Sequence, residues 1–373
     1  MKIGIIGAGI GGLTTALALK GNDRQITIYE KATQIKPVGA GIVMASNAMQ
    51  VFDTLGIRKV IENSGHIVSE IYIADNQLKT ISKTNLTNLE LKYGVKNIAI
   101  HRADLQKILT EAIGYETIKL SKRLLKIEDN NNYKLIFEDG NSEVCDVLIG
   151  ADGIHSVIRN QLFGGGKIRN TNQKCWRGLC DFKLSEEYKH KAFELWGKGK
   201  RFGFVQVSNQ KVYWYAVINS HLQQEKNNLL HLFSDFHHDV LTLIEATPKE
   251  AIILNDIIDL QPINKWCKNK ICLIGDAAHA TTPNMGQGAC QAVEDAFVLG
   301  KLFKESNNIE QIFAKYEQLR MKKAHYIANM SQKIGKIAHF ENNLAMWCRN
   351  QLLKTVPDSF NEKQLDKIFN ITY

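Results

Sequence analysis

The sequence predicts an α/β fold in which a Rossmann-like, dinucleotide-binding domain is interleaved with a mostly antiparallel β-sheet domain and followed by C-terminal helices. Three observations support this prediction. A glycine-rich turn joins a strand to a helix at the start of the chain, apolar strands recur near residues 147 and 271, and residues 173–264 alternate in the manner of sheet. A chain of 373 residues also exceeds the roughly 250–300 residues that one core usually spans, so two domains are expected.

The opening stretch predicts a phosphate-binding turn. Lys2–Ile6 is an apolar run typical of a buried strand, an amphipathic helix follows, and Gly7, Gly9 and Gly12 stand between them in G-x-G-x-x-G spacing. A second strand, QITIYE, ends at Glu30. The glycines permit a tight turn close to a pyrophosphate, the helix N-terminus attracts phosphate, and a carboxylate at this spacing accepts ribose hydroxyls. This context favours a dinucleotide site over a glycine packing turn or a secretory signal.

Composition narrows the class of protein. The net charge is +9, but Lys and Arg are spread along the chain and the densest basic stretch, GKGKR at 197–201, is short, so no nucleic-acid partner is expected. The chain has seven cysteines, an odd number, and no CxxC pair. We therefore expect no disulfide framework and no metal site, and this cysteine usage favours a reducing, cytoplasmic compartment. After the N-terminal stretch, the sequence contains no run of 18 or more uncharged apolar residues, so we expect no integral membrane segment.

A second signal lies at residues 270–295, KICLIGDAAHATTPNMGQGACQAVED. A buried strand runs into Asp276, a loop contains Pro283 and Gly286, and a helix starts near 286–288. Further motifs are CDVLIGADGIHSVIR at 145–159, IHRADLQKIL at 100–109 and VGAGIVMASNAMQVFDTLGI at 38–57. Together they resemble the class A flavin-dependent aromatic hydroxylases of the p-hydroxybenzoate hydroxylase type, nearest the urate-hydroxylating branch. The resemblance covers nearly the whole chain and weakens after about residue 325.

The resemblance implies that FAD is the cofactor and gives each motif a role. The first glycine motif binds the pyrophosphate, Glu30 binds the adenosine ribose, and Lys31 borders adenine. Arg102 neutralises phosphate or holds the ribityl chain, Leu124 meets adenine through its backbone, and Asp276 binds a ribityl hydroxyl. The helix start after Gly286 offers N–H groups to the reduced, anionic flavin ring. The implied cofactor-binding residues are Gly7, Gly9, Gly12, Glu30, Lys31, Gly41, Arg102, Leu124, Asp152, Asp276, Pro283, Gly286, Gln287, Gly288 and Ala289.

Three of the polar residues in these motifs have alternative interpretations. Asp276 could cap the turn that follows it. Asp152 precedes Gly153 and could be a turn aspartate instead of a cofactor ligand. We interpret His279 as an orienting, structural histidine and not a general base, because no paired carboxylate accompanies it in the motif.

The middle of the chain predicts the substrate-binding sheet. Short, aromatic tracts with the alternation of β-strands occur here, namely FELWGKGKRFGFVQV and KVYWYAVI. Residues 70–98 show a similar β-rich pattern. Arg201 and Tyr213 stand in a register that resembles the urate branch, which implies that they engage substrate at the catalytic centre; the alternatives are a surface arginine and a core tyrosine. Arg177, in CWRGLC, departs from that branch, where a small amide is expected.

The domain boundaries follow from these patterns. We expect residues 1–69, 99–172 and 265–320 to form the FAD-binding domain, 70–98 and 173–264 the substrate-binding sheet domain, and 321–373 a helical C-terminal segment. Residues 224–250 and 321–353 are expected to be helical. The second of these segments should pack on the FAD-binding domain with its lysines solvated, although its aromatic residues would also suit a membrane surface.

The family resemblance implies a reaction and its partners. NADPH or NADH, bound transiently, reduces FAD, O₂ adds at C4a, and the hydroperoxyflavin hydroxylates an aromatic or heteroaromatic small molecule. No second nucleotide motif is found for the nicotinamide, since GGGK at 164–167 has the wrong spacing. Two alternatives stay open at this point: a flavin-dependent reductase or dehydrogenase that does not use O₂, and a non-catalytic flavoprotein redox sensor. The sequence does not predict an oligomeric state.

Overall fold

The computed structural model describes residues 1–35, 40–130, 132–223 and 228–373. Two of the sequence patterns extend beyond these ranges. Val38 and Gly39 of the motif at 38–57, and residues 224–227 of the expected helical stretch 224–250, lie outside the described residues.

A six-stranded sheet forms the half of the molecule that contains the first glycine motif; because the sequence predicts that this half binds a dinucleotide, we call it the nucleotide-binding half. Neighbouring strands are parallel, apart from the antiparallel pair at one edge, and the two central strands are apolar and buried. Such a sheet needs helices on its faces, and its five parallel strands, all except β18, point their carboxyl ends to the same edge. In spatial order the strands are β18 (Cys267–Lys268), β19 (Ile271–Leu273), β12 (Val147–Gly150), β1 (Lys2–Ile6), β2 (Gln25–Tyr29) and β8 (Ile118–Lys119).

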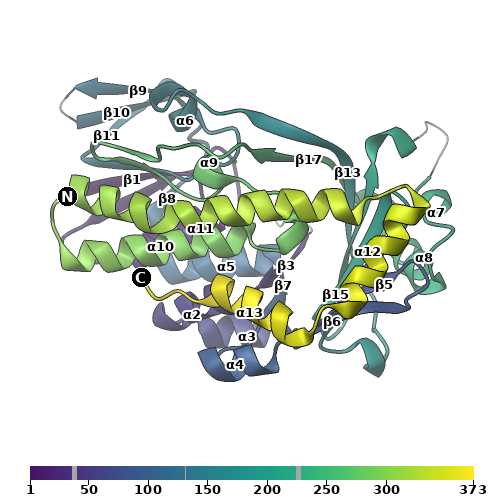
Figure 1. The fold of residues 1–373 in the computed structure, drawn as a ribbon. Helices are drawn as coiled ribbons and strands as arrows, with labels where there is room; N and C mark the ends of the chain where they lie inside the picture. The colour runs from purple at the N-terminus through teal and green to yellow at the C-terminus, as the bar shows by residue number, and fades with distance from the viewer. Residues whose placement is uncertain (36–39, 131, 224–227) are drawn as a thin grey trace.

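Helices from distant parts of the chain cover this sheet. α1 (Ile10–Ala18) follows the glycine turn and contacts both α5 (Arg102–Ile113) and α10 (Gly288–Glu305). α10 in turn packs against α2 (Ser46–Thr54) and the long helix α11 (Ile309–Ala338), which Figure 1 shows crossing the molecule. The smaller helices here are α3 (Arg58–Ser64), α4 (Thr87–Tyr93), α6 (Val157–Leu162) and α9 (Asp276–His279).

A seven-stranded sheet forms the second half. All its neighbouring pairs are antiparallel except β14 with β5. One face packs Phe202, Phe204 and Trp214 against α7 (Leu229–Leu232) and α8 (His238–Glu245) in a separate hydrophobic core. The strand order is β17 (Ile253–Leu260), β13 (Ile168–Asp181), β16 (Lys211–Asn219), β15 (Lys200–Ser208), β14 (Lys191–Trp196), β5 (Glu70–Asp75) and β6 (Thr80–Asn85).

Two smaller sheets complete the strands. β3 (Gly41–Met44), β7 (Ile98–His101) and β4 (His66–Ile67) form an antiparallel sheet that touches the seven-stranded one, where Val205 and Val207 pack against Ala99. β11 (Ser142–Cys145), β10 (Asn132–Phe137) and β9 (Leu124–Asn130) form the other. The chain therefore leaves the nucleotide-binding half and returns to it, as the interleaved pattern predicts.

Three expectations about local structure need correction. The stretch 70–98 is not wholly β, because α4 occupies part of it. Residues 228–250 form two short helices with a break between them. The segment 321–353 is the end of α11 and most of α12 (Asn343–Thr355). The end of α11 packs on the nucleotide-binding half as expected, with Ala324 and Ile327 in its core, whereas α12 contacts β6 of the seven-stranded sheet (Figure 1). α13 (Asp358–Phe369) also contacts β6. Among the described residues, no helix has the length and apolar character needed to cross a bilayer.

We expect a buried histidine to make stability depend on pH. His66 in β4 is 7% exposed and stacks on His190 with ring centroids 4.8 Å apart. Burial, followed by repulsion from His190 and Lys189, lowers the pKa of His66 to about 4. The neutral form therefore stabilises the fold above the unfolded pKa of about 6.5, and this stability is lost as pH falls toward 4.

Urea unfolding at pH 7.5 and pH 5 measures this loss, which is at most about 1.4 kcal/mol per pH unit for one histidine. His66→Phe keeps the stacked ring without its titration and should flatten the slope. An identical slope in both proteins would contradict the assignment.

Candidate active site

The carboxyl edge of the six-stranded sheet gathers the sequence motifs. β1, β2, β12 and β19 end side by side, and the residues that follow them are Gly7, Glu30, Ala151 and Ile274. Main-chain bonds hold the strand ends together: Gly7 N–H donates to the Tyr29 carbonyl at 2.8 Å, and Ala151 N–H donates to Ile6 at 2.9 Å. In open α/β sheets, ligands bind outside this edge.

The glycine turn is shaped to receive a ligand. Gly7 has a φ of +107°, and a Cβ at Gly12 would collide with the Gly7 carbonyl, so the turn and the start of α1 need both glycines. A Cβ at Gly9, by contrast, would meet no described atom within 4 Å. No described side chain caps α1 at Gly9. The open space and the uncapped helix start form a cradle with N–H donors.

Glu30 joins this turn to the next strand. Its Oε2 accepts the Ala8 N–H at 2.8 Å and its Oε1 accepts the Ala32 N–H at 2.9 Å. The Lys122 N–H donates to the Glu30 carbonyl at 2.8 Å, which brings the segment before Leu124 alongside. Lys31 is exposed. The expected adenosine-side residues are thus adjacent in space.

The second motif presents a carboxylate and a helix start at the same edge. Asp276 opens α9 and is exposed, whereas the other residues in 271–280 are all buried. After the short helix η5 (Pro283–Met285), Gly286 adopts a φ of +61° and α10 begins at Gly288. No described side chain caps this helix at Gln287. α10 therefore offers free N–H groups and a partial positive charge.

The Asp-Gly motif after β12 has a structural role as well. Asp152 Oδ2 accepts the N–H groups of Val157 and Ile158 at 2.8 and 3.3 Å, so it holds the start of α6. Its buried Oδ1 has no partner among the described residues, and burial raises the pKa of Asp152. Arg159, from the same motif, donates to the Ala277 carbonyl at 2.9 Å and so connects this motif to α9.

These features fit an FAD dinucleotide. The cradle at Gly9 suits a pyrophosphate, the carboxylates of Glu30 and Asp276 suit ribose and ribityl hydroxyls, and the uncapped start of α10 suits an electron-rich ring. The described residues leave room for the group where its most charged portion would bind.

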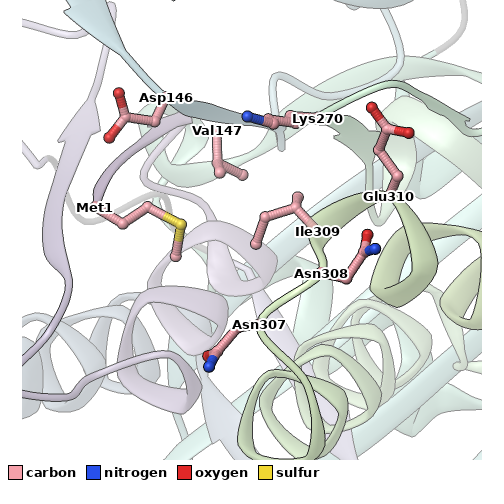
Figure 2. A pocket seen from close by; sticks show the side chains of 8 residues that line it. All are labelled: Met1, Asp146, Val147, Lys270, Asn307, Asn308, Ile309 and Glu310. Carbon is pink, nitrogen blue, oxygen red and sulfur yellow. The ribbon is translucent and has the colours of Figure 1, made fainter.

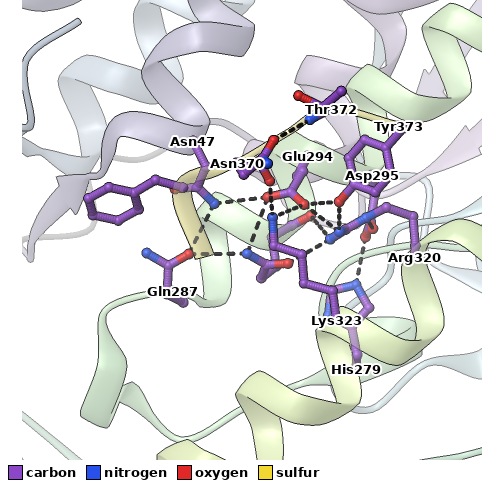
Figure 3. Close-up of polar contacts among 12 residues, drawn as sticks. Asn47, His279, Gln287, Glu294, Asp295, Arg320, Lys323, Asn370, Thr372 and Tyr373 are labelled. Atoms are coloured by element: carbon purple, nitrogen blue, oxygen red, sulfur yellow. Dashed lines mark hydrogen bonds and ion pairs between the residues drawn. The ribbon is translucent and has the colours of Figure 1, made fainter. Parts of the chain in front are cut away.

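A buried ion cluster fixes the same elements in place (Figure 3). Arg320 of α11 is 0% exposed and bonds Asp295 at 2.8 Å, Glu294 at 2.5 Å and Gln291 at 2.7 Å. From these partners the network reaches two of the sequence motifs, at 38–57 and 270–295. Glu294 accepts from Asn47, Gln291 donates to Gln287, and Asp295 accepts from Gly275 and bonds His279. Lys323 and Tyr373 complete it at Glu294.

His279 is a structural residue with a carboxylate partner that the motif did not reveal. It is 4% exposed, and its Nε2 lies 2.6 Å from Asp295 Oδ2. Burial raises the pKa of Asp295, but His279 and Arg320 outweigh it and the pKa lies below its ordinary value. The structural interpretation of His279 is supported, while the statement that it lacks a paired carboxylate is wrong. Asp295 lies sixteen residues away on α10, which conceals the pairing in the sequence.

One face of the seven-stranded sheet carries the expected substrate residues. Directly paired residues share a face, so the pairings Trp196↔Arg201, Glu194↔Gly203↔Tyr215↔Arg177 and Val205↔Tyr213 place these side chains together. Tyr213 lies against Gly41, where any Cβ would overlap its ring. The NH2 of Arg201 donates to Asn284 of η5. This face therefore meets the flavin-motif loop, and Arg201 is 1% exposed, not a surface residue.

Sequence reasoning missed Glu194 on this face. Its Oε1 lies 3.1 Å from Arg201 NH1. The sequence pattern that could have identified Glu194 is its position in FELW, where apolar and polar residues alternate and Glu194 therefore faces away from the apolar core. The pairing itself depends on the register of β14 with β15.

A separate hollow lies at the opposite edge of the parallel sheet (Figure 2). Met1, Asp146, Val147 and Lys270 line it together with the residues that precede and begin α11. These positions are at the amino ends of β1, β12 and β19, so the hollow is not at the edge where the dinucleotide motifs gather.

Comparison with known proteins identifies the family. Residues 1–330 match the family described as FAD binding domain. Aurachin C monooxygenase/isomerase of Stigmatella aurantiaca is 35% identical and covers 94% of this chain and 93% of its own. FAD-dependent urate hydroxylase of Klebsiella pneumoniae is 30% identical, with 91% of each chain covered. The solved structure of Klebsiella pneumoniae HpxO complexed with FAD and uric acid has a TM-score of 0.91 at 26% identity, covering 99% and 96%.

The chain belongs to this FAD-binding family. The resemblance to class A flavin hydroxylases and the α/β fold class are confirmed.

We expect Gly9→Val to fold but to lose FAD. A Cβ at this position meets no described atom within 4 Å, and the valine side chain would occupy the pyrophosphate cradle. Flavin absorbance after purification and the melting temperature measure the two effects separately. Gly12→Ala is the matched comparison, because its Cβ meets backbone and should lower the melting temperature. Full flavin content in Gly9→Val would refute the assignment of the space at Gly9 as the pyrophosphate site.

Arg320→Met should destabilise the protein by about 3–5 kcal/mol, because it leaves Glu294 and Asp295 buried without their cation. Denaturant unfolding measures the change. Lys323→Met removes one contact to Glu294 and one to the Asn370 carbonyl, but it leaves both buried carboxylates paired with Arg320 and should cost less. Equal stability of Arg320→Met and the wild type would show that the cluster does not hold these elements.

Proposed function

We propose that this flavoprotein hydroxylates a planar heteroaromatic small molecule held between the start of α10 and the inner face of the seven-stranded sheet. The protein is an FAD-dependent monooxygenase, as its family and its relatives, which include a urate hydroxylase, indicate. The single observation that carries the placement of the substrate is the contact of Arg201 with Asn284, which joins the sheet face to the flavin-motif loop.

FAD, reduced by NADPH or NADH, supplies the chemistry that activates O₂ for transfer to the substrate. In our proposal the chain binds and orients it. The Gly7–Gly12 turn holds the pyrophosphate, with Arg102 at the start of α5 as a further cation. Glu30 and Asp276 accept hydroxyls. The partial positive charge of α10 stabilises the electron-rich ring, and the Arg320 cluster keeps that helix start fixed.

The sheet face would position the substrate and exclude water. Tyr213 is half-buried and lies against Gly41, so its ring can pack against a planar ligand. Burial raises the pKa of Tyr213, so its hydroxyl keeps its proton and can donate to a substrate oxygen. Arg201 supplies a second donor. No side chain of the chain has to act as a nucleophile in this scheme.

The experiment follows NAD(P)H oxidation and oxygen uptake by the yellow, FAD-loaded protein across a panel of aromatic and heteroaromatic compounds. We expect both rates to rise together when a substrate is added. NAD(P)H that reduces the flavin without oxygen uptake would favour a reductase, and a flavin that no NAD(P)H reduces would contradict both enzymatic functions.

Tyr213→Phe should raise KM for the substrate by about two- to tenfold with unchanged FAD content, since one hydrogen bond is lost. Tyr188→Phe is the control, because Tyr188 packs on Phe193 and Phe204 at the opposite face of the sheet. Equal KM values in the wild type and Tyr213→Phe would remove Tyr213 from the substrate site.

A further inference from the structure

The inner face of the seven-stranded sheet holds a charge pair close to the proposed substrate position. Arg201 NH1 lies 3.1 Å from Glu194 Oε1, and the side chains are 1% and 18% exposed. The charge of the arginine is therefore balanced within the protein before any ligand binds. An arginine available to hold an anionic substrate would lack such a partner.

Glu194 is ionised and retains capacity to accept. Its Oε1 accepts from Trp196 Nε1 at 2.6 Å as well as from Arg201, and its Oε2 accepts the Tyr215 hydroxyl. Burial raises the pKa of Glu194, but Arg201, Tyr215 and Trp196 outweigh it and the pKa lies below its ordinary value. A carboxylate has about four acceptor positions, so these three bonds leave one free, on Oε2.

Arg201 retains a free donor. Its two terminal nitrogens donate to Glu194 and Asn284, whereas its buried Nε has no hydrogen-bond partner among the described residues. A buried donor without a partner costs roughly 1–3 kcal/mol, so a native site is expected to supply an acceptor when its ligand binds. The pair thus offers a free acceptor position on Glu194 and, among the remaining N–H groups of Arg201, a buried donor at Nε.

The other ionisable groups nearby are one neutral histidine and two arginines, so the charge balance described above is between Arg201 and Glu194 alone. His339 is 5% exposed, and burial together with Arg201 lowers its pKa to about 3, so it is neutral. Arg177 lies across from Tyr215 and donates to Asn255 at 2.7 Å. Arg102 is exposed and opens α5, whose first N–H donates to Ala40 beside the cofactor edge.

We propose that Glu194 determines the substrate class and that the site takes an uncharged heteroaromatic ring that carries both an N–H and an oxygen. Glu194 Oε2 would accept the ring N–H, and Arg201 Nε would donate to the oxygen. A carboxylate-bearing substrate would place a second anion beside Glu194, which the site disfavours. This inference rests on the proposed function, and it makes Glu194 a substrate-contacting residue.

The test measures ligand binding to the FAD-loaded protein by calorimetry and by the flavin absorbance change. The three probes share one ring system: 4(1H)-quinolone, its N-methyl derivative, and 4-hydroxyquinoline-2-carboxylate. The first should bind at least about tenfold more tightly than the other two, because the second lacks the N–H and the third adds a negative charge. Wild-type protein that binds the carboxylate or the N-methyl probe as well as the quinolone, or that binds none of them, overturns the proposal.

The variant Glu194→Gln tests the residue itself. It removes the charge and should reduce the preference for N–H over N-methyl to less than about threefold, while the carboxylate probe should gain about tenfold because Arg201 is no longer neutralised. Glu187→Gln, at an exposed position, is the matched control and should bind like the wild type. Unchanged probe ratios in Glu194→Gln overturn the proposal. If Glu194→Gln fails to fold, the affinities of the wild type for the three probes still test the proposed substrate class.

Failure of the proposed function gives results that differ from failure of this inference. In that case the flavin is absent, or no ring compound raises NAD(P)H oxidation or oxygen uptake. Failure of this inference leaves flavin content and stimulated oxidation intact and changes only which probes bind.

Discussion

The architecture of the cofactor edge depends on one buried arginine. Arg320 reaches from α11 to Glu294 and Asp295 of α10, and through them to the turn at Gly275 and to Asn47 of α2. The cluster thus joins the motif at 270–295, which contains the Gly275 turn and the start of α10, to the motif at 38–57, which contains Asn47. Buried charges are stable only when they are paired and hydrogen-bonded, so the cluster permits one relative arrangement of α2, α9, α10 and α11. The start of α10 is held by side chains behind it and needs no cap in front.

The molecule uses two electrostatic arrangements for its two proposed ligands. At the edge of the parallel sheet, uncapped helix starts and backbone N–H groups favour negative charge, as a dinucleotide requires. On the inner face of the seven-stranded sheet, Arg201 and Glu194 form an ion pair, and under our proposal this pair favours directional hydrogen bonds with an uncharged ring. The two arrangements meet at Asn284, a neutral residue in the loop before α10. This division would allow a charged cofactor and a neutral substrate to lie close together.

The interleaved chain path explains how a small contact can join the two halves. β5 and β6 come early in the chain, between segments of the nucleotide-binding half, and the long β13 and β17 run between the halves (Figure 1). The C-terminal helices α12 and α13 contact β6 at the edge of the seven-stranded sheet. Each half has its own hydrophobic core. Polar pairs such as Arg201 with Asn284 can therefore determine the register between the halves without contributing most of the stability.

By itself, the sequence determined the local features. The turn at Gly7–Gly12, the strand that ends at Glu30, and the start of α10 at Gly288 were all predicted, because glycine spacing, apolar strands and helix starts depend on residues close together in the chain. Only the tertiary structure decided which charges pair. His279 with Asp295 and Arg320 with Glu294 join residues on different helices, and Arg201 with Glu194 follows from strand register. A charge carries no sequence mark of its partner, because long-range packing brings the two together.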